Sequence, residues 1–202
     1  MSDKISIFNN ALIESHVDAT ITNVNEKSPE AERCNRIYDF TRKELLSMYP
    51  WTFARKYVKL ARIAEDVEGY KYAYKYPSEA LRINDIYVDE VSFQRRKCIP
   101  FEQADAKPGM LDGNKVILCD YEEPFISENV DIETESLFPE HFCRLLYLYM
   151  ADKIAKMSGA SDKILDRISS NISTQLSFCA TVSNREDSQS KDCINYYVDV
   201  RN

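Results

Sequence analysis

The spacing of apolar residues predicts two helices at the start of the chain. Within residues 3–14 the apolar side chains recur every three to four positions, which gives a helix one apolar face. We expect a second helix to begin at Ser28-Pro29, because serine is a favoured N-cap and proline fits the first helical turn. This helix should end at Tyr49, since Pro50 disfavours the helical conformation in the residue before it.

Beyond Trp51 the pattern changes from the period of helices to that of strands. The segments become short and rich in tyrosine and β-branched residues, and glycine, proline or acidic turns separate them. We therefore expect four or five strands between residues 51 and 121. Pro100 predicts an edge strand or a bulge, because proline cannot donate to a sheet ladder. Pro50-Trp51 marks the exit from helix to sheet, where the large Trp51 side chain can pin the two layers together.

Two more helices are predicted in the last third of the chain. Between Phe142 and Ala151 the only charged residue is Arg144, so the helix that starts near residue 139 is apolar on nearly every side. Such a helix must be covered all round, either inside a bundle or by another subunit. A short link to Ser161, a favoured N-cap, makes the next helix its antiparallel neighbour.

This order of elements predicts an α+β fold. We expect a four-helix bundle made of residues 1–50 and 138–182, with a small, mainly antiparallel β-sheet in the inserted residues 51–137. Residues 183–202 are polar enough to form a flexible, extended C-terminal arm. The arm ends in a strand-like segment that we expect to contact a partner through Tyr196, Tyr197, Val198, Val200 and Arg201.

Composition narrows the class of protein. The chain has 202 residues, of which 44% are hydrophobic, enough for a sizeable core, and its formal charge is −7. Nucleic-acid-binding proteins usually carry a basic domain or stripe, so an acidic chain is a poor candidate for that class. The sequence starts without the apolar segment of a signal peptide, and no apolar run approaches the ~20 residues that span a bilayer. We therefore expect a protein made in a cytoplasm, without a membrane partner.

The cysteines and histidines predict neither a metal site nor a cofactor. None of the six cysteines forms a Cys-x-x-Cys pair, and His16 and His141 lie far apart in the sequence. We expect the cysteines to be small buried residues in a reducing compartment. Four widely spaced glycines cannot form a phosphate-binding loop, and no Gly-x-Ser-x-Gly motif is present. We predict no catalytic, cofactor-binding or metal-binding residues.

Two patterns leave other functions open. From Asp120 to Glu140 the chain has eight acidic residues and no lysine or arginine. They can supply paired carboxylates for glycoside hydrolysis, or form a solvated connection, which we expect in the middle of the stretch. Basic residues interleaved with aromatic ones suit a nucleic-acid-binding module, or a sheet face whose long basic side chains extend into solvent. The basic residues are Arg55, Lys56, Lys59 and Arg62, and the aromatic ones are Trp51, Phe53 and Tyr57.

One long stretch resembles a known family. The segment AERCNRIYDFTRKELLSMYPWTFARKYVKLARI, followed shortly by YKYAYKYPSEALRI, is similar to tail tubular protein A, the head-to-tail adaptor of short-tailed bacteriophages. The matching positions are Ala31 with Cys34, Arg42, Pro50-Trp51 with Phe53-Ala54, Tyr74 with Pro77, and Leu81-Arg82. The likeness covers roughly residues 5–180. The chain departs from it at Glu79 and Ala80, where the family has Asp-Cys, and in the missing Leu-Gly after the first helix.

The resemblance implies a structural virion protein of the tail neck, made in the host bacterial cytoplasm, and not an enzyme. Copies would form a dodecameric ring that joins the portal protein to the distal tail (nozzle) protein. The ring would line the DNA exit channel without binding DNA specifically, which suits an acidic chain. No cofactor or membrane is implied. A tail-associated peptidoglycan hydrolase with paired carboxylates and a nucleic-acid-binding module are the alternatives.

Overall fold

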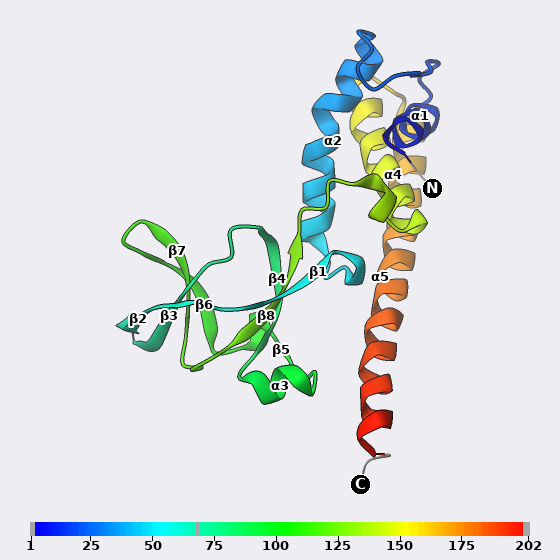
Figure 1. Cartoon of the computed structure of the whole chain (residues 1–202). Coiled ribbons are helices and arrows are strands. Elements are labelled where there is room, and N and C mark those ends of the chain that lie inside the picture. Colours follow the sequence, from blue (N-terminus) through cyan, green and yellow to red (C-terminus); the bar gives the residue numbers. More distant parts are fainter. Residues whose placement is uncertain (1–2, 68, 200–202) are drawn as a thin grey trace. The chain divides into compact units, whose positions relative to one another are not determined.

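The computed structural model describes residues 3–67 and 69–199, with side chains described through Asp187. It has an α+β fold, with five α-helices and two four-stranded antiparallel sheets among the described residues (Figure 1). The chain divides into two compact units. We call Met1–Phe53 with Ile132–Glu186 the helical unit, and Ala54–Asp131 with Asp187–Asn202 the β unit.

The first two helices begin and end where the sequence predicts. Helix α1 spans Lys4–Glu14, and α2 spans Pro29–Met48. The Ser28 side chain accepts a hydrogen bond from the backbone N–H of Ala31 at 3.3 Å, which caps α2. At the other end Tyr49 is extended, as the residue before a proline should be.

Helix α4 (Glu140–Met157) forms the centre of the helical unit. Nine of its residues are buried, from Phe142 to Ala155, and they pack against α1 and α2. The first half of α5 (Asp162–Asp199) also lies against it, because the Gln175 amide and the Cys179 thiol both donate to the carbonyl oxygen of His141. The apolar helix is therefore covered by its own chain, which is one of the two possibilities left open by its sequence.

The expected four-helix bundle is not confirmed. Helix α1 has 11 residues and α4 has 18, so α1 is too short to run alongside the whole of α4. Figure 1 shows α1 nearly end-on, whereas α2 runs up the picture, so the two helices cross at a large angle. The sheets are inserted between α2 and α4, and the short helix α3 (Glu90–Gln94) lies within the same insertion.

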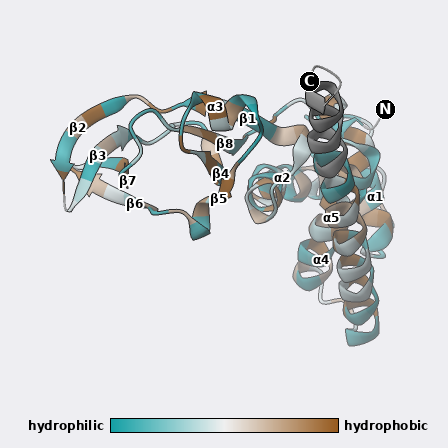
Figure 2. Cartoon of the chain, turned by 90° about the horizontal axis from the view of Figure 1, so that it is seen from below, coloured by the Kyte–Doolittle hydropathy of each residue, from teal (hydrophilic) through white to brown (hydrophobic). Residues whose placement is uncertain are grey.

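The inserted strands form two sheets instead of the single sheet that was expected. The first has the order β1 (Arg55–Lys59), β8 (Phe125–Val130), β4 (Ala80–Tyr87) and β5 (Ile99–Pro100). The second has the order β2 (Arg62–Val67), β3 (Tyr70–Lys75), β7 (Asn114–Cys119) and β6 (Ala106–Leu111), and these strands follow one another in Figure 2. Both sheets supply the core of the β unit: Leu60, Tyr74, Ile83, Ile86, Ile117, Cys119 and Ile126. Pro100 lies in an edge strand, which confirms that prediction.

Strand β8 contradicts the expectation of an exposed connection within the acidic stretch. It lies inside the first sheet, pairs with both β1 and β4, and residues 126–129 are buried. Its polar residues are held by partners on β4. The Ser127 hydroxyl donates to Asp85 Oδ2 at 2.7 Å, and the Asn84 amide donates to Asn129 Oδ1 at 2.8 Å. These tertiary bonds hold the polar centre of a strand whose ends, Phe125-Ile126 and Val130, have high strand preference.

Helix α5 contradicts the expectation of an extended arm. The helix runs without a break through Asp199, and the chain has no glycine or proline between Asp162 and Asp199 that would end it. Side chains near residue 183 bind the segment after α2: the Tyr49 hydroxyl donates to Asn184 Oδ1, and the Ser183 hydroxyl accepts from the backbone N–H of Thr52. Of the expected partner-binding residues, Tyr196, Tyr197 and Val198 lie in this helix, and Val200 and Arg201 are outside the described residues.

Trp51 belongs to the core of the helical unit. Its side chain is fully buried, and its indole Nε1 donates to the carbonyl oxygen of Leu45 at 2.7 Å, near the end of α2. The ring meets that of Phe142 on α4 edge-on, with 5.5 Å between the ring centres. The residue that follows α2 thus fixes the end of that helix against α4.

We predict that Trp51→Ala destabilises the helical unit by roughly 3–5 kcal/mol, because it leaves a large cavity and an unpaired Leu45 carbonyl. Urea unfolding followed by circular dichroism at 222 nm measures this change. Phe40→Ala is the matched control, since the Phe40 side chain on α2 is 67% exposed and its removal should change stability by about 0.5 kcal/mol or less. Equal effects of the two substitutions would contradict the role given to Trp51.

Candidate functional site

The residues that carry the family resemblance are structural. Those in the helical unit are Ala31, Cys34, Arg42, Pro50, Trp51 and Phe53, and those in the β unit are Ala54, Tyr74, Pro77, Leu81 and Arg82. All are buried or half-buried. Tyr74 shows their function: its hydroxyl reaches the carbonyl oxygens of Tyr121 and Glu122, each at 2.6 Å, and so holds the chain that follows β7. These positions specify packing within each unit and do not converge on one site.

Arg42 is the one charged member of this set that is almost fully buried, with 4% of its side chain exposed. Its guanidinium lies 3.1 Å from Asp39 Oδ1 and 4.0 Å from Glu133 Oε1. One turn earlier on α2, the Tyr38 hydroxyl donates to Glu135 Oε1 at 2.9 Å, and burial raises the Tyr38 pKa. Two acids of the acidic stretch therefore hold the segment before α4 against α2.

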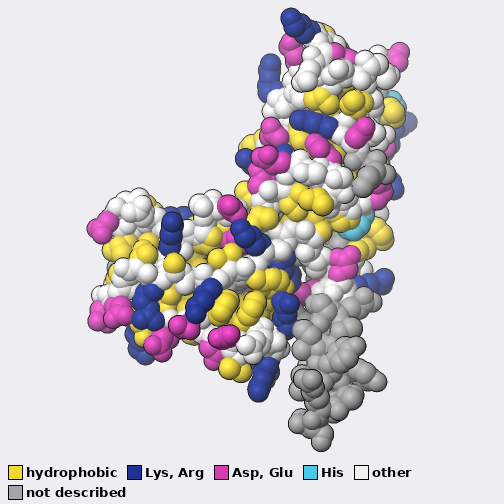
Figure 3. Space-filling model, viewed as in Figure 1, with side chains coloured by type: hydrophobic (Ala, Val, Ile, Leu, Met, Phe, Trp, Pro, Cys, Tyr) yellow, Lys and Arg dark blue, Asp and Glu magenta, His cyan; other side chains and the backbone are white. Residues whose placement is uncertain are grey.

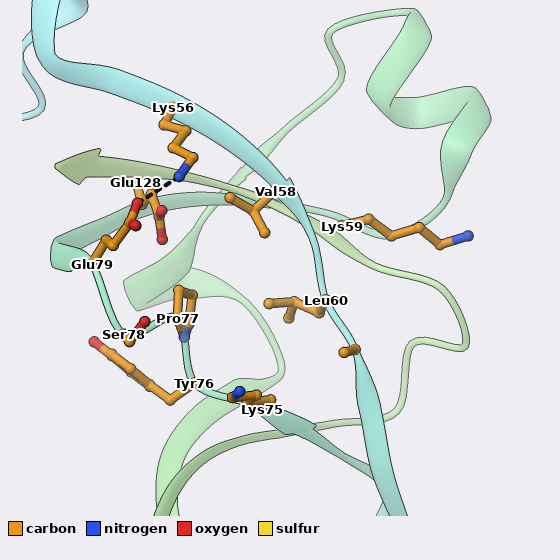
Figure 4. A pocket seen from close by; sticks show the side chains of 11 residues that line it. Lys56, Val58, Lys59, Leu60, Lys75, Tyr76, Pro77, Ser78, Glu79 and Glu128 are labelled. Carbon is orange, nitrogen blue, oxygen red and sulfur yellow. Dashed lines mark hydrogen bonds and ion pairs between the residues drawn. The ribbon is translucent and has the colours of Figure 1, made fainter.

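Three more acids of that stretch, Asp120, Glu123 and Glu128, lie in the β unit. Asp120 accepts a hydrogen bond from the backbone N–H of Lys71, and Glu123 forms an ion pair with Lys59 at 3.0 Å. Glu128 is different, because it lies on β8 and lines a pocket of about 250 Å³ in the β unit. We therefore regard this pocket, shown in Figure 4, as the candidate site.

Three segments build the pocket. Strand β1 and the residues after it supply Lys56, Val58, Lys59, Leu60 and Ala61, the turn after β3 supplies Lys75 to Glu79, and β8 supplies Glu128. In the first sheet Glu128 lies directly opposite Lys56 on β1 and Ile83 on β4. Paired residues of an antiparallel sheet project to the same face, so Glu128 occupies an end of the apolar core face to which Ile83 and Ile126 belong.

The carboxyl group of Glu128 is in an unfavourable environment. Only 1% of the residue is exposed, and its Oε2 has no hydrogen-bond partner among the described residues. Burial raises the pKa of Glu128, nearby Lys56 lowers it in part, and the neighbouring Glu79 raises it again. A buried carboxyl without a donor favours the protonated form.

An exposed ion pair lies beside this buried acid. Lys56 Nζ is 2.6 Å from Glu79 Oε2, and this hydrogen bond lowers the pKa of Glu79 and raises that of Lys56. Figure 4 shows the Lys56 amine beside both carboxyl groups. Two carboxyls with pKa values shifted in opposite directions are typical of acid–base pairs. A glycosidase, however, must bind a sugar between its two carboxyl groups. Here Glu79 is bonded to Lys56, and Glu128 is buried, which counts against glycoside hydrolysis at this pair.

The basic residues singled out for nucleic-acid binding are all paired with acids. Lys56 pairs with Glu79, Lys59 with Glu123, Arg62 with Glu65, and Arg55 with Asp187. In Figure 3, lysine and arginine side chains are interspersed with acidic ones over the strands. Ion pairs of this kind leave little net positive charge to neutralise phosphates, which counts against a nucleic-acid-binding module.

Other chemistry finds no support in the described residues. Four of the cysteines are buried, and burial raises the pKa of Cys34 to about 11, so its thiolate is scarcely populated at neutral pH. No group of three or more metal-ligating side chains occurs in the part of the chain that the structure describes. None of the described helices is both long enough and apolar enough to cross a membrane.

A comparison of the chain with protein-family models and with curated proteins finds no match.

We predict that Glu128→Gln becomes more stable relative to the native chain as the pH rises from 4 to 7. The folded Glu128 holds its proton more tightly than the unfolded chain does, so native stability falls above about pH 4.3, where the unfolded glutamate ionises. The gain at neutral pH should be about 1.4 kcal/mol for each pKa unit of the rise. Urea unfolding at several pH values measures it.

Glu79→Gln is the control for this experiment, because the pKa of Glu79 is lowered instead of raised. Its ionised form contributes stability above the unfolded pKa, and this contribution is lost as the pH falls through the folded value. The Glu79→Gln variant should therefore lose stability relative to the native chain as the pH rises to about 4.3, and its difference from the native chain should stay nearly constant above that pH, where Glu128→Gln gains stability. The same sign for both variants would refute the assignment.

Proposed function

We propose that this protein is a structural virion component, a head-to-tail adaptor whose copies form a ring between the portal and the distal tail and line the DNA exit channel. The proposal rests first on the resemblance of residues 31–82 to the adaptor family. The observation that carries it is an exposed face of α5. A ring protein must present a surface to its neighbours that can lose its water at little cost.

This face has no charge. From Ile168 to Asn184 the chain has 17 successive residues without lysine, arginine, aspartate or glutamate. The exposed ones, which we call the α5 face, are Ser169, Ser170, Ser173, Thr174, Ser177, Phe178, Thr181 and Asn184. At 3.6 residues per turn they cover about half of the helix surface. Depletion of charge distinguishes the core of an interface from the rest of a protein surface.

Four of the six hydroxyl groups of the α5 face are bonded inside the helix. Those of Ser173, Thr174, Ser177 and Thr181 each donate to the carbonyl oxygen one turn earlier, at 2.9–3.1 Å. Burying a polar group is costly when its hydrogen bond is lost, and these four donors keep their bonds inside the helix. Another helix can therefore cover these four positions without supplying new acceptors, and Phe178, which is 54% exposed, supplies an apolar centre.

The helix α4 does not add to this support, because its apolar surface is covered by α1, α2 and α5 of the same chain. The interface of the proposed ring is thus assigned to α5. The end of α5 beyond Asp187 contains Tyr196 and Tyr197 and is the segment we assign to contact with the portal or the nozzle protein.

We predict that Ser173→Glu together with Ser177→Glu prevents ring formation and leaves the monomer folded. Two charges on the α5 face would have to be buried without partners, which should weaken assembly at least tenfold. Sedimentation velocity and negative-stain microscopy of the chain, with and without the portal protein of the same phage, measure assembly. Circular dichroism verifies the fold.

Lys163→Glu is the matched control, since it lowers the net charge by two, as the double variant does, at an exposed position of α5 outside the α5 face. It should assemble as the native chain does. A truncation after Asp187 should form no complex with the portal while retaining the bonds of Ser183 and Asn184. Native assembly by the double glutamate variant, or no ring of the native chain on the portal, would overturn the proposal.

A further inference from the structure

The pocket beside Glu128 has an unmet need for a hydrogen-bond donor. Glu128 Oε2 is buried and has no partner among the described residues, although a buried acceptor without a donor is costly. Three lysines line the pocket, Lys56, Lys59 and Lys75. Lys56 is bonded to Glu79 and Lys59 to Glu123, and none of the three donates to Glu128 Oε2.

The Lys56–Glu79 ion pair beside Glu128 can be replaced by a ligand. Lys56 and Glu79 are 50% and 66% exposed, and ion pairs at such positions contribute little to stability. Lys56 has a long, flexible side chain that can turn into solvent at low cost. A cation that binds both carboxylates can therefore take the place of the Lys56 ammonium.

The walls of the pocket suit an apolar stem that carries a charge. Val58, Leu60 and Pro77 are apolar, and Tyr76 adds an aromatic ring. The ring of Tyr76 already attracts one cation, because Lys115 Nζ lies 3.7 Å from its centre. Lys115 lines a second, adjoining pocket of about 750 Å³ and not the pocket of Glu128, although Tyr76 lines both.

We propose that this pocket is a binding site for a guanidinium group, such as that of an arginine side chain, which displaces the Lys56 ammonium and donates to Glu79 and Glu128 together. A guanidinium has five donors in a planar fork and can reach two carboxylates at once, whereas Lys56 is bonded to Glu79. Its three-carbon stem then packs on Tyr76 and Pro77. The site lies in the β unit and does not depend on ring formation by α5.

The test titrates the full chain with Nα-acetyl-arginine methylamide and follows backbone amide shifts by NMR and heat by calorimetry. The citrulline analogue is the matched control ligand, because it has the same shape without the charge. We expect saturable binding of the arginine compound, with shifts centred on residues 56–60, 75–79 and 126–129, and none of the citrulline compound. No saturable binding, or equal binding of both, would overturn the proposal.

Two substitutions should act in opposite directions. Glu128→Gln should weaken binding about tenfold or more, because it removes one of the two charges. Lys56→Met should tighten binding about threefold to fivefold. It removes the ammonium group that competes with the ligand for Glu79, and an exposed ion pair of this kind contributes a free energy of that size. Circular dichroism verifies that both variants fold.

Arg62→Met and Glu65→Gln are the matched controls. They form another ion pair at the surface of the same unit, and neither residue lines the pocket. Both should bind as the native chain does. Weaker binding by Lys56→Met would refute the site, and so would equal tightening by Arg62→Met, because general electrostatic attraction would then account for the binding.

The guanidinium has two possible sources, which sedimentation velocity separates. If it belongs to a second copy of the chain, excess arginine compound should lower the association state at high protein concentration, and Glu128→Gln should do the same. If it belongs to a free compound, association should be unaffected while binding persists. Either sedimentation result upholds the site and identifies the source of the guanidinium. Failure of ring formation on the portal would contradict the proposed adaptor function but not this binding site.

Discussion

The β unit depends on the need to satisfy polar groups that are buried inside a sheet. Strand β8 lies between β1 and β4, and three of its residues, Ser127, Glu128 and Asn129, are polar. The strand can occupy this position because β4 offers Asp85 to Ser127 and Asn84 to Asn129. The side of the strand that carries Glu128 meets the apolar core, and there no described donor reaches one carboxyl oxygen, Oε2.

The same constraint separates what the sequence predicts from what it does not. Helix α2 follows from local signals, the Ser28 cap and Pro50, which act within one turn and need no knowledge of the fold. Strand β8 has no such signal, because FISENV becomes a strand through bonds to residues about 40 positions earlier. The continuation of α5 does not follow from composition either, because a polar segment suggests an arm although no residue in it breaks a helix.

The candidate pocket could be predicted from sequence only in its parts. The cluster of acidic residues from Asp120 to Glu140 predicts paired carboxylates in the stretch that contains Glu128, and the series of basic residues from Arg55 to Arg62 includes Lys56. Neither pattern shows that strand pairing places Lys56 opposite Glu128, or that the turn after β3 brings Glu79 to the same place. Register is a property of the assembled sheet, so a shift by one residue would turn Glu128 to the other face and remove the pocket.

The α5 face and the pocket of Glu128 differ in whether their polar groups have hydrogen-bond partners, and this difference suits them to different kinds of binding. Four hydroxyl groups of the α5 face are bonded within the helix and lose little when they are covered, which suits a permanent contact between identical copies. Glu128 differs, because its Oε2 accepts no hydrogen bond from any described residue. Packing alone would be served as well by glutamine or isoleucine at this position of β8. A carboxylate there makes physical sense when a cation from outside completes it, and the exposed Lys56–Glu79 pair is then the weak bond that such a cation replaces.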